Sequence, residues 1–279
     1  MRSNFFNLLG GRWKNDRFIC VGLDSDPAKI PAHITGSVYE RILAFNQAII
    51  DATVSVAGAF KPQAAVYEGQ GEEGTRALRD TVRYIKRHYP DLPVILDAKR
   101  GDIGSTNQWY VQSIFDDLGF DAVTVQPYLG GVALEPFLAQ KDKGIIVLCH
   151  TSNPGAGELQ TLPVGESGQP LYQYVATQVA EQWNGNNNCA LVMGATYPEP
   201  LTIVRKMLPE MVFLIPGIGA QGGNLEATVK AARTATGEGM IINSSRGIIF
   251  ASSGLDFAEA AAAEAKKLNQ QINQYRHER

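Results

Sequence analysis

Short apolar runs alternate with longer segments of helical periodicity along almost the whole chain. The apolar runs cover residues 18–23, 58–60, 94–96, 121–125, 144–149, 189–193, 212–215 and 240–242. Helical spacing of apolar side chains follows each run, over about residues 37–56, 75–88, 105–118, 132–139, 171–183, 198–208, 225–235 and 256–273. Eight strands that are each followed by a helix predict an α/β protein with a (β/α)8 TIM barrel fold.

The same pattern predicts a single domain over residues 1–279. An α/β barrel uses about 250 residues as one domain, and the chain contains no second unit or low-complexity tract. An open, doubly wound sheet is the alternative, although such sheets usually have fewer strands. Outside the repeats, residues 5–9 predict a short amphipathic turn, Gly69 and Gly71 open a loop, and residues 151–168 form the longest irregular stretch.

Composition limits the partners and the cellular context. The 279 residues are 44% hydrophobic and carry a formal net charge of −3. No basic block is present, which argues against nucleic acid as a partner. The three cysteines form no CxxC pair and lie in apolar runs, as expected of buried thiols in a reducing compartment. The sequence shows no signal peptide and no apolar stretch of membrane-spanning length, so we expect a soluble cytoplasmic protein.

Charged residues end the third predicted strand. Asp97 and Lys99 are two positions apart, so in an extended strand their side chains point to the same side. Asp102 follows after a turn at Gly101. Two carboxylates and an ammonium group beside a buried strand are costly unless they are paired. A structural ion-pair network and a catalytic lysine held between carboxylates both fit this stretch.

Polar or charged residues follow six of the eight predicted strands. A (β/α)8 barrel places its active site at the carboxyl ends of its strands, so these side chains are expected to meet in one site. At any single position, a structural ion pair is the alternative. The residues are Asp24, Lys61, Asp97, Lys99, Ser152, Gln221 and Arg246.

The ends of the last two strands resemble a phosphate site. Residues 216–223, P-G-I-G-A-Q-G-G, can expose several backbone N–H groups, and residues 244–247, S-S-R-G, supply a guanidinium group. Barrels often bind phosphate at this pair of strands. No His, Cys or carboxylate cluster has the spacing of metal ligands. Trp13, Trp109 and Trp183 are expected to serve packing rather than ligand binding.

Six motifs together resemble one enzyme family over nearly the whole chain, the orotidine 5'-phosphate decarboxylases, and in particular their longer bacterial type. The resemblance implies decarboxylation of orotidine 5'-monophosphate to UMP and CO2 in de novo pyrimidine biosynthesis, without a cofactor or a metal. The motifs are V-G-L-D (21–24), F-K-P (60–62), D-A-K-R-G-D-I-G-S-T (97–106), T-S-N-P-G-A (151–156), P-G-I-G-A-Q-G-G (216–223) and S-R-G-I (245–248).

The resemblance also implies roles for individual residues. Lys99 would protonate C6 of the pyrimidine as CO2 leaves, and Asp97 would lie beside the substrate carboxylate. Asp102 would reach into the site of a second subunit of a homodimer. The complete Lys–Asp–Lys–Asp chain would be Lys61, Asp97, Lys99 and Asp102.

The remaining implied roles concern substrate binding. Ribose hydroxyls would be bound by Asp24 and Lys61, and the pyrimidine by Ser152. The phosphate would be bound by Gln221 and Arg246, while Ile103 and Thr106 would lie near Asp102 at the shared site.

Two other functions are compatible with parts of the pattern. A sister decarboxylase on the same barrel would use Mg²⁺ and would carry an acidic ligand near the end of the second strand, where this chain has Lys61. A barrel that only binds a nucleotide phosphate would not need Lys99 or Asp97, and both are present. Sensitivity to a chelator, or binding without turnover, would favour these alternatives.

Overall fold

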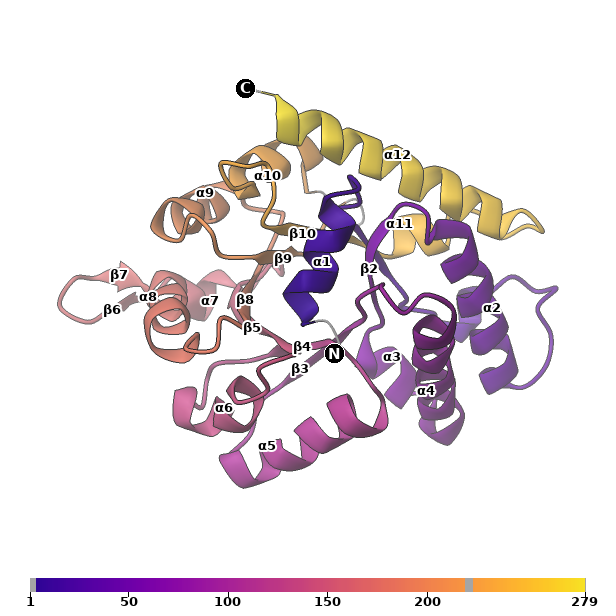
Figure 1. The fold of residues 1–279 in the computed structure, drawn as a ribbon, viewed down its shortest axis with the longest axis horizontal. Helices are drawn as coiled ribbons and strands as arrows, with labels where there is room; N and C mark the ends of the chain where they lie inside the picture. The colour runs from indigo at the N-terminus through magenta and orange to yellow at the C-terminus, as the bar shows by residue number, and fades with distance from the viewer. Residues whose placement is uncertain (1–3, 219–222, 279) are drawn as a thin grey trace.

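The structure is a computed structural model that describes residues 4–218 and 223–278. Its centre is an eight-stranded sheet in the order β2-β1-β10-β9-β8-β5-β4-β3, and all its paired strands are parallel. The helices lie around this sheet (Figure 1). This arrangement of parallel strands and surrounding helices confirms the predicted (β/α)8 barrel.

The barrel strands are short and almost completely buried, as expected of parallel strands that are covered on both faces, except that the second half of β3 is partly exposed. Two isolated parallel bridges, Phe60 with Val94 and Gln63 with Asp97, join β2 to the β3 side of the sheet and bring its two edges together. The strands are β1 (Ile19–Gly22), β2 (Ala57–Lys61), β3 (Ile95–Arg100), β4 (Ala122–Val125), β5 (Gly144–His150), β8 (Cys189–Met193), β9 (Phe213–Ile215) and β10 (Met240–Ser244).

Amphipathic helices pack around the barrel, and α2 shows how the sequence sets their start: Ser37 and Glu40 form a capping box at its first turn. The main helices are α1 (Phe5–Trp13), α2 (Val38–Thr53), α4 (Gly71–His88), α5 (Gly104–Val111), α6 (Gly131–Leu138), α8 (Leu171–Gln178), α9 (Pro198–Met207), α10 (Leu225–Ala232) and α12 (Phe257–His277). Shorter helical segments are η1 (Pro27–Lys29), α3 (Ala64–Glu68), η2 (Gln112–Asp117), α7 (Gly157–Gln160), η3 (Val179–Trp183) and α11 (Arg246–Ile249).

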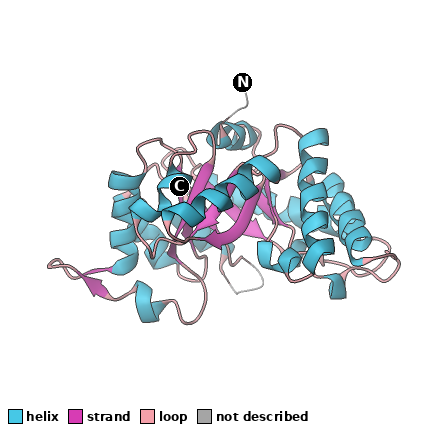
Figure 2. Cartoon of the chain, turned by 90° about the horizontal axis from the view of Figure 1, so that it is seen from below, coloured by secondary structure: helices cyan, strands magenta, loops and turns pink. Residues whose placement is uncertain are grey.

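Three expectations about local structure need correction. Helix α4 begins at Gly71 rather than near residue 75, so the loop expected to open at Gly69 and Gly71 is only a short turn between α3 and α4. Residues 151–168 are not simply irregular, because they hold α7 and the first strand of a small hairpin. The hairpin pairs β6 (Pro163–Val164) with β7 (Gln169–Pro170) and projects from the barrel (Figures 1 and 2). Its turn glycines, Gly165 and Gly168, both have positive φ angles, which apolar periodicity does not reveal.

Helix α1 covers the amino-terminal end of the barrel. Phe5 and Leu9 are buried, and the Phe5 N–H donates to the carbonyl of Asp142 at 3.2 Å. Arg12 donates through Nε to the carbonyl of Ala57, where β2 begins, at 2.8 Å. Figure 1 shows α1 lying across the strands at this end. Since this end is covered, the carboxyl ends of the strands are left to form a binding site.

Two other features of the described chain bear on the sequence expectations. The three cysteines are free and buried, as predicted. Among the described residues, no helix has both the length and the apolar character needed to cross a membrane.

Candidate active site

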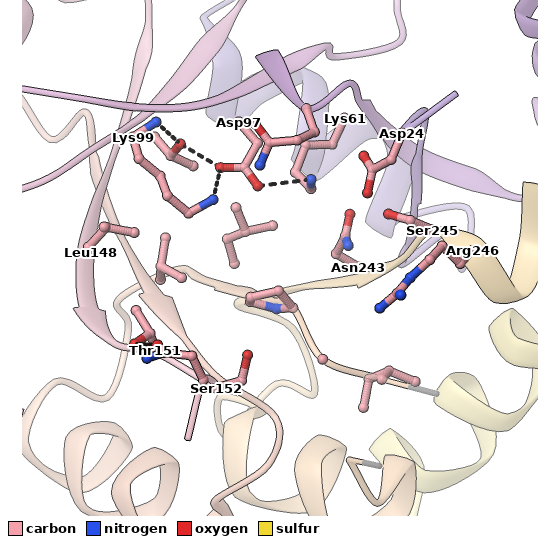
Figure 3. Close-up of a pocket in the computed structure, with 18 of the residues that line it drawn as sticks. Asp24, Lys61, Asp97, Lys99, Leu148, Thr151, Ser152, Asn243, Ser245 and Arg246 are labelled. Carbon is pink, nitrogen blue, oxygen red and sulfur yellow. Dashed lines mark hydrogen bonds and ion pairs between the residues drawn. The ribbon is translucent and has the colours of Figure 1, made fainter. Parts of the chain in front are cut away.

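A cavity of about 520 Å³ opens at the carboxyl ends of the barrel strands. Six of the predicted site residues line it, each from a different strand end or the loop after it, except that Asp97 and Lys99 share β3 (Figure 3). They are Asp24, Lys61, Asp97, Lys99, Ser152 and Arg246. The predicted phosphate ligand Gln221 lies outside the described residues.

A row of three charged side chains forms one wall of the cavity. The Lys61 ammonium group lies 3.1 Å from Oδ2 of Asp97, and the Lys99 ammonium group lies 2.7 Å from Oδ1 of the same carboxylate. Lys61 is almost completely buried, whereas the Lys99 side chain is 46% exposed. Lys99 therefore reaches from the carboxylate into the open part of the cavity, where a substrate would lie.

The protonation states of this row follow from burial and charge. Burial alone would lower the pKa of Lys61, but the negative charges of Asp97 and Asp24 outweigh it and raise that pKa above its ordinary value. Burial would raise the pKa of Asp97, yet the positive charges of Lys61 and Lys99 hold it well below its usual range. The Lys61–Asp97 pair is therefore ionised at neutral pH.

Thr124 on β4 holds the end of β3 in place, and the sequence did not indicate this role. Its hydroxyl donates to Oδ1 of Asp97 at 2.9 Å and accepts the backbone N–H groups of Ala98 and Lys99 at 3.0 and 2.9 Å. Lys99 has a φ of +48°, in the left-handed region that non-glycine residues rarely adopt. The β3–β4 register also shifts between Leu96 and Arg100. Thr124 thus stabilises the irregularity that directs Lys99.

Arg246 lies on another side of the cavity, at the start of the short helix α11. Figure 3 shows its guanidinium group pointing toward the cavity, with Ser245 beside it. A side chain at Gly22 would place its Cβ 1.7 Å from the Ser245 hydroxyl, so only glycine allows β1 to approach this closely. An exposed guanidinium group at a cavity rim suits an anionic group such as a phosphate.

The loop after β5 forms the wall that contains Ser152. The Gln160 side chain accepts the Thr151 N–H at 2.9 Å and donates to the Thr151 hydroxyl at 2.8 Å, so α7 anchors this loop. Gly194 at the end of β8 packs against it, because a Cβ there would lie 2.7 Å from the Ser152 nitrogen. Gln160 and Thr151 are therefore cavity residues that sequence inspection missed.

Asp102, Ile103 and Thr106 do not line the cavity of the single chain. They lie at the start of α5, where Ile103 is 58% exposed. Trp109 on the same helix is 71% exposed, so it does not serve the expected packing role within this chain. Other exposed apolar side chains follow in the neighbouring segment, namely Tyr128, Leu129 and Val132.

The alternative of a metal-dependent barrel predicts a cluster of acidic or imidazole ligands. Within residues 4–218 and 223–278, no group of three or more His, Cys, Asp or Glu side chains is arranged to hold a metal ion. The end of β2, where the sister enzymes place an acidic ligand, carries the Lys61–Asp97 ion pair instead.

A comparison with protein families decides the assignment. Residues 17–263 match the model of the orotidine 5'-phosphate decarboxylase / HUMPS family. The chain belongs to this family. The resemblance predicted from the six motifs is therefore confirmed.

Full-length relatives and solved structures agree with the family match. The orotidine 5'-phosphate decarboxylase of Azoarcus sp. (strain BH72) is 50% identical over 98% of this chain and 100% of its own length. The structure of Leishmania donovani OMP decarboxylase is 39% identical, with a TM-score of 0.85 over 99% of this chain and 100% of that chain. The structure of Leishmania donovani UMP synthase is 40% identical, with a TM-score of 0.87 over 98% of this chain. This chain spans only 57% of that longer protein.

Proposed function

We propose that this chain decarboxylates orotidine 5'-monophosphate to UMP and CO2 without a cofactor, and that Lys99 supplies the proton to C6. The observation that carries the proposal is the Lys61–Asp97–Lys99 row, which places a partly exposed ammonium group beside a largely buried carboxylate in the barrel cavity. The names of the full-length relatives support the choice of substrate.

The chemistry explains why such a row is useful. When the bond from C6 to the carboxylate breaks, the electron pair stays on C6 in an orbital orthogonal to the ring π system, and CO2 leaves. No ordinary electron sink is available, so the charge must be stabilised electrostatically. A preorganised ammonium group aimed at C6 does this more strongly in the transition state than in the ground state. Proton transfer from Nζ to C6 completes UMP, and the resulting amine regains a proton from water.

The other walls of the cavity are assigned to the ribose, the pyrimidine ring and the phosphate of the substrate. In this proposal Asp24 and Lys61 bind the ribose hydroxyls, Ser152 binds the pyrimidine, and Arg246 binds the phosphate with Gln221. Binding energy from the phosphate, which is remote from C6, can offset the cost of orienting the reacting carbon.

We further propose that the active unit is a homodimer in which Asp102, Ile103 and Thr106 complete the cavity of the partner subunit. Two features support this arrangement. These residues lie outside the cavity of their own chain, and the same region exposes large apolar side chains, including Trp109 and Val132. Helices α5 and α6, which carry these two side chains, pack against each other, and exposed apolar side chains grouped in one region are typical of interaction sites. The cytoplasmic location expected from the sequence stays a prediction.

The proposal is tested by the decrease in orotidine 5'-monophosphate absorbance with purified protein, in the presence and absence of excess EDTA. We expect equal turnover in both, with UMP as the product. Turnover that EDTA abolishes would instead support the Mg²⁺-dependent alternative. Binding of UMP by folded dimeric protein without any turnover would support a barrel that only binds nucleotides.

A further inference from the structure

Asn243 is a buried polar residue in the cavity wall to which the family resemblance gave no role. It lies on β10, opposite Cys20 of β1 in the sheet register, and its side chain lines the cavity. Only 6% of the residue is exposed, and its Oδ1 atom is buried without a hydrogen-bond partner among the described residues. Figure 3 shows its side chain on the cavity side, between Lys61 and Arg246.

The other buried asparagines of the described chain behave differently. Asn46, Asn107, Asn188 and Asn269 all use their side chains in hydrogen bonds to neighbouring groups. Asn188, for example, donates to the carbonyls of Leu138 and Gln140, both at 3.1 Å. A buried carbonyl without a donor is energetically costly, so native proteins rarely retain one without a functional reason.

A second unpartnered acceptor lies in the same cavity. Four buried side-chain N or O atoms in the described part of the chain have no partner, and two of them belong to cavity residues: Oδ1 of Asn243 and Oδ1 of Asp24. Both atoms are oxygens that can only accept a hydrogen bond. Figure 3 shows the Lys61 ammonium group, which is a donor, to one side of these two side chains and near both. The cavity therefore presents two acceptors and one donor in one region.

We infer that Asn243 is a substrate-binding residue that, together with Asp24, selects a ribose diol over a deoxyribose. A vicinal diol offers one O–H donor for the amide oxygen of Asn243, a second for the carboxylate oxygen of Asp24, and lone pairs for the Lys61 ammonium group, whereas an ionised phosphate or carboxylate offers no donor. A deoxyribose would leave one buried oxygen unpaired, and sites built around a substrate hydroxyl reject analogues that lack it. This inference rests on the proposed function for the identity of the ligand, and it adds Asn243 to the residues that recognise it.

The test is the binding of UMP, 2'-deoxy-UMP and 3'-deoxy-UMP to the wild-type protein and to Asn243→Leu, measured by calorimetry. The wild type should bind at least one deoxy ligand about 10- to 100-fold more weakly than UMP. In Asn243→Leu, the ratio of UMP affinity to the affinity for that deoxy ligand should fall toward one. If the wild type binds all three ligands equally, or if the ratio is unchanged in the variant, the inference is wrong.

A matched control separates ligand recognition from structure. Asn188→Leu removes a buried asparagine far from the cavity whose amide is fully hydrogen-bonded, so it should lower the melting temperature and leave the UMP to deoxy-UMP ratio unchanged. Asn243→Leu should keep the melting temperature or raise it, because it removes an unpaired polar group. A large loss of melting temperature with equal weakening of all three ligands would show a structural role and overturn the inference. If Asn243→Leu does not fold, the same UMP to deoxy-UMP affinity ratios are measured for Asn243→Ala and compared with those of the wild type.

Failure of the inference is distinguishable from failure of the proposed function. Decarboxylation without discrimination between UMP and its deoxy analogues would remove only the role of Asn243. If the protein discriminates between UMP and its deoxy analogues but does not decarboxylate orotidine 5'-monophosphate, the diol site stands and the proposed function is wrong.

Discussion

The ammonium group of Lys99 lies 2.7 Å from Oδ1 of Asp97, although Lys99 has a left-handed backbone conformation. A non-glycine residue in that conformation is strained, and such strain persists only where the surroundings hold it. Here the hydroxyl of Thr124 holds it, by accepting the Lys99 N–H and donating to the Asp97 carboxylate. The direction of the Lys99 ammonium group, the proposed proton donor, thus depends on one threonine of the neighbouring strand.

Replacement of Thr124 by valine should therefore lower the rate of the chemical step more than it lowers the affinity for UMP. The variant leaves two backbone N–H groups without their acceptor, so we expect a loss of about 1–3 kcal/mol in the free energy of unfolding. Because Lys99 is then less well aimed, kcat should fall about 10- to 100-fold, with a smaller change in UMP affinity. Steady-state kinetics and UMP titration measure both effects.

Two variants serve as controls for Thr124→Val. Thr124→Ser keeps the hydroxyl and should recover most of kcat. Thr53→Val removes a buried hydroxyl that bonds the Ile49 carbonyl within α2, far from the cavity, and should leave kcat unchanged. Full activity of Thr124→Val would show that the backbone holds Lys99 without the hydroxyl.

Lys99→Ala tests the proposed proton donor directly. Without the ammonium group the carbanion at C6 has no preorganised partner, so kcat should fall by at least about 10²- to 10³-fold. UMP binding should stay measurable, since the ribose and phosphate contacts are intact. The exposed lysine Lys266 offers a matched control, and Lys266→Ala should retain full activity. Substantial turnover by Lys99→Ala would remove Lys99 from the mechanism.

The low pKa of Asp97 predicts how stability depends on pH. In the unfolded chain an aspartate has a pKa of about 4, whereas Lys61 and Lys99 outweigh burial and hold the folded Asp97 pKa well below that. Between these values the unfolded state binds a proton that the folded state does not, so the stabilisation is present above pH 4 and is lost as pH falls further. Asp97 alone should contribute a slope of about 1.4 kcal/mol per pH unit in that window.

Denaturant unfolding of the wild type and of Asp97→Asn between pH 5 and pH 2.5 measures this slope. The wild type should lose stability more steeply below pH 4 than the variant, which has no carboxylate to protonate at this position. Parallel curves for the two proteins would show that the Asp97 pKa is not depressed in the folded state.

The sequence was enough to predict that the polar residues at the strand ends lie together in one site. The carboxyl ends of the strands in a (β/α)8 barrel always meet at the same face, whatever the details of side-chain packing. It also predicted that Asp97 and Lys99 face the same side, and both do line the cavity. Plain strand alternation is not the reason, however, since the register slips between Leu96 and Arg100 and Lys99 leaves the extended conformation. Hydrophobic periodicity shows which face of a strand is buried, but it contains no information about whether one residue adopts a left-handed backbone conformation.

Other parts of the site could not be predicted for similar reasons. Thr124 and Asn243 lie within strands that read as ordinary buried segments, and their significance depends on partners that are present or absent in three dimensions. The anchoring of Thr151 by Gln160 needs the short helix α7, whose four residues give too little periodicity to detect. The exposure of Trp109 on α5 likewise follows from which face the helix turns outward.

Arg246→Ala tests the phosphate assignment. Loss of a charge-assisted contact should weaken UMP binding about 10- to 100-fold, and should raise KM for orotidine 5'-monophosphate more than it lowers kcat. Uridine, which has no phosphate, is the matched ligand, and its affinity should be the same for the variant and the wild type. Equal UMP affinity in both proteins would place the phosphate elsewhere.

Asp102 and Lys99 should complement each other across a dimer interface. Asp102→Ala and Lys99→Ala homodimers are each expected to be defective at both sites. In a mixed dimer, one site contains both defects, while the other combines an intact Lys99 with an intact Asp102 from the opposite subunit. Random exchange of equal amounts should thus restore about a quarter of the wild-type sites. Activity is measured after exchange, which is followed independently with differently tagged subunits. If exchange is complete and activity stays at the level of the separate variants, Asp102 acts within its own chain, and the exposed surface around Ile103 and Trp109 needs another explanation.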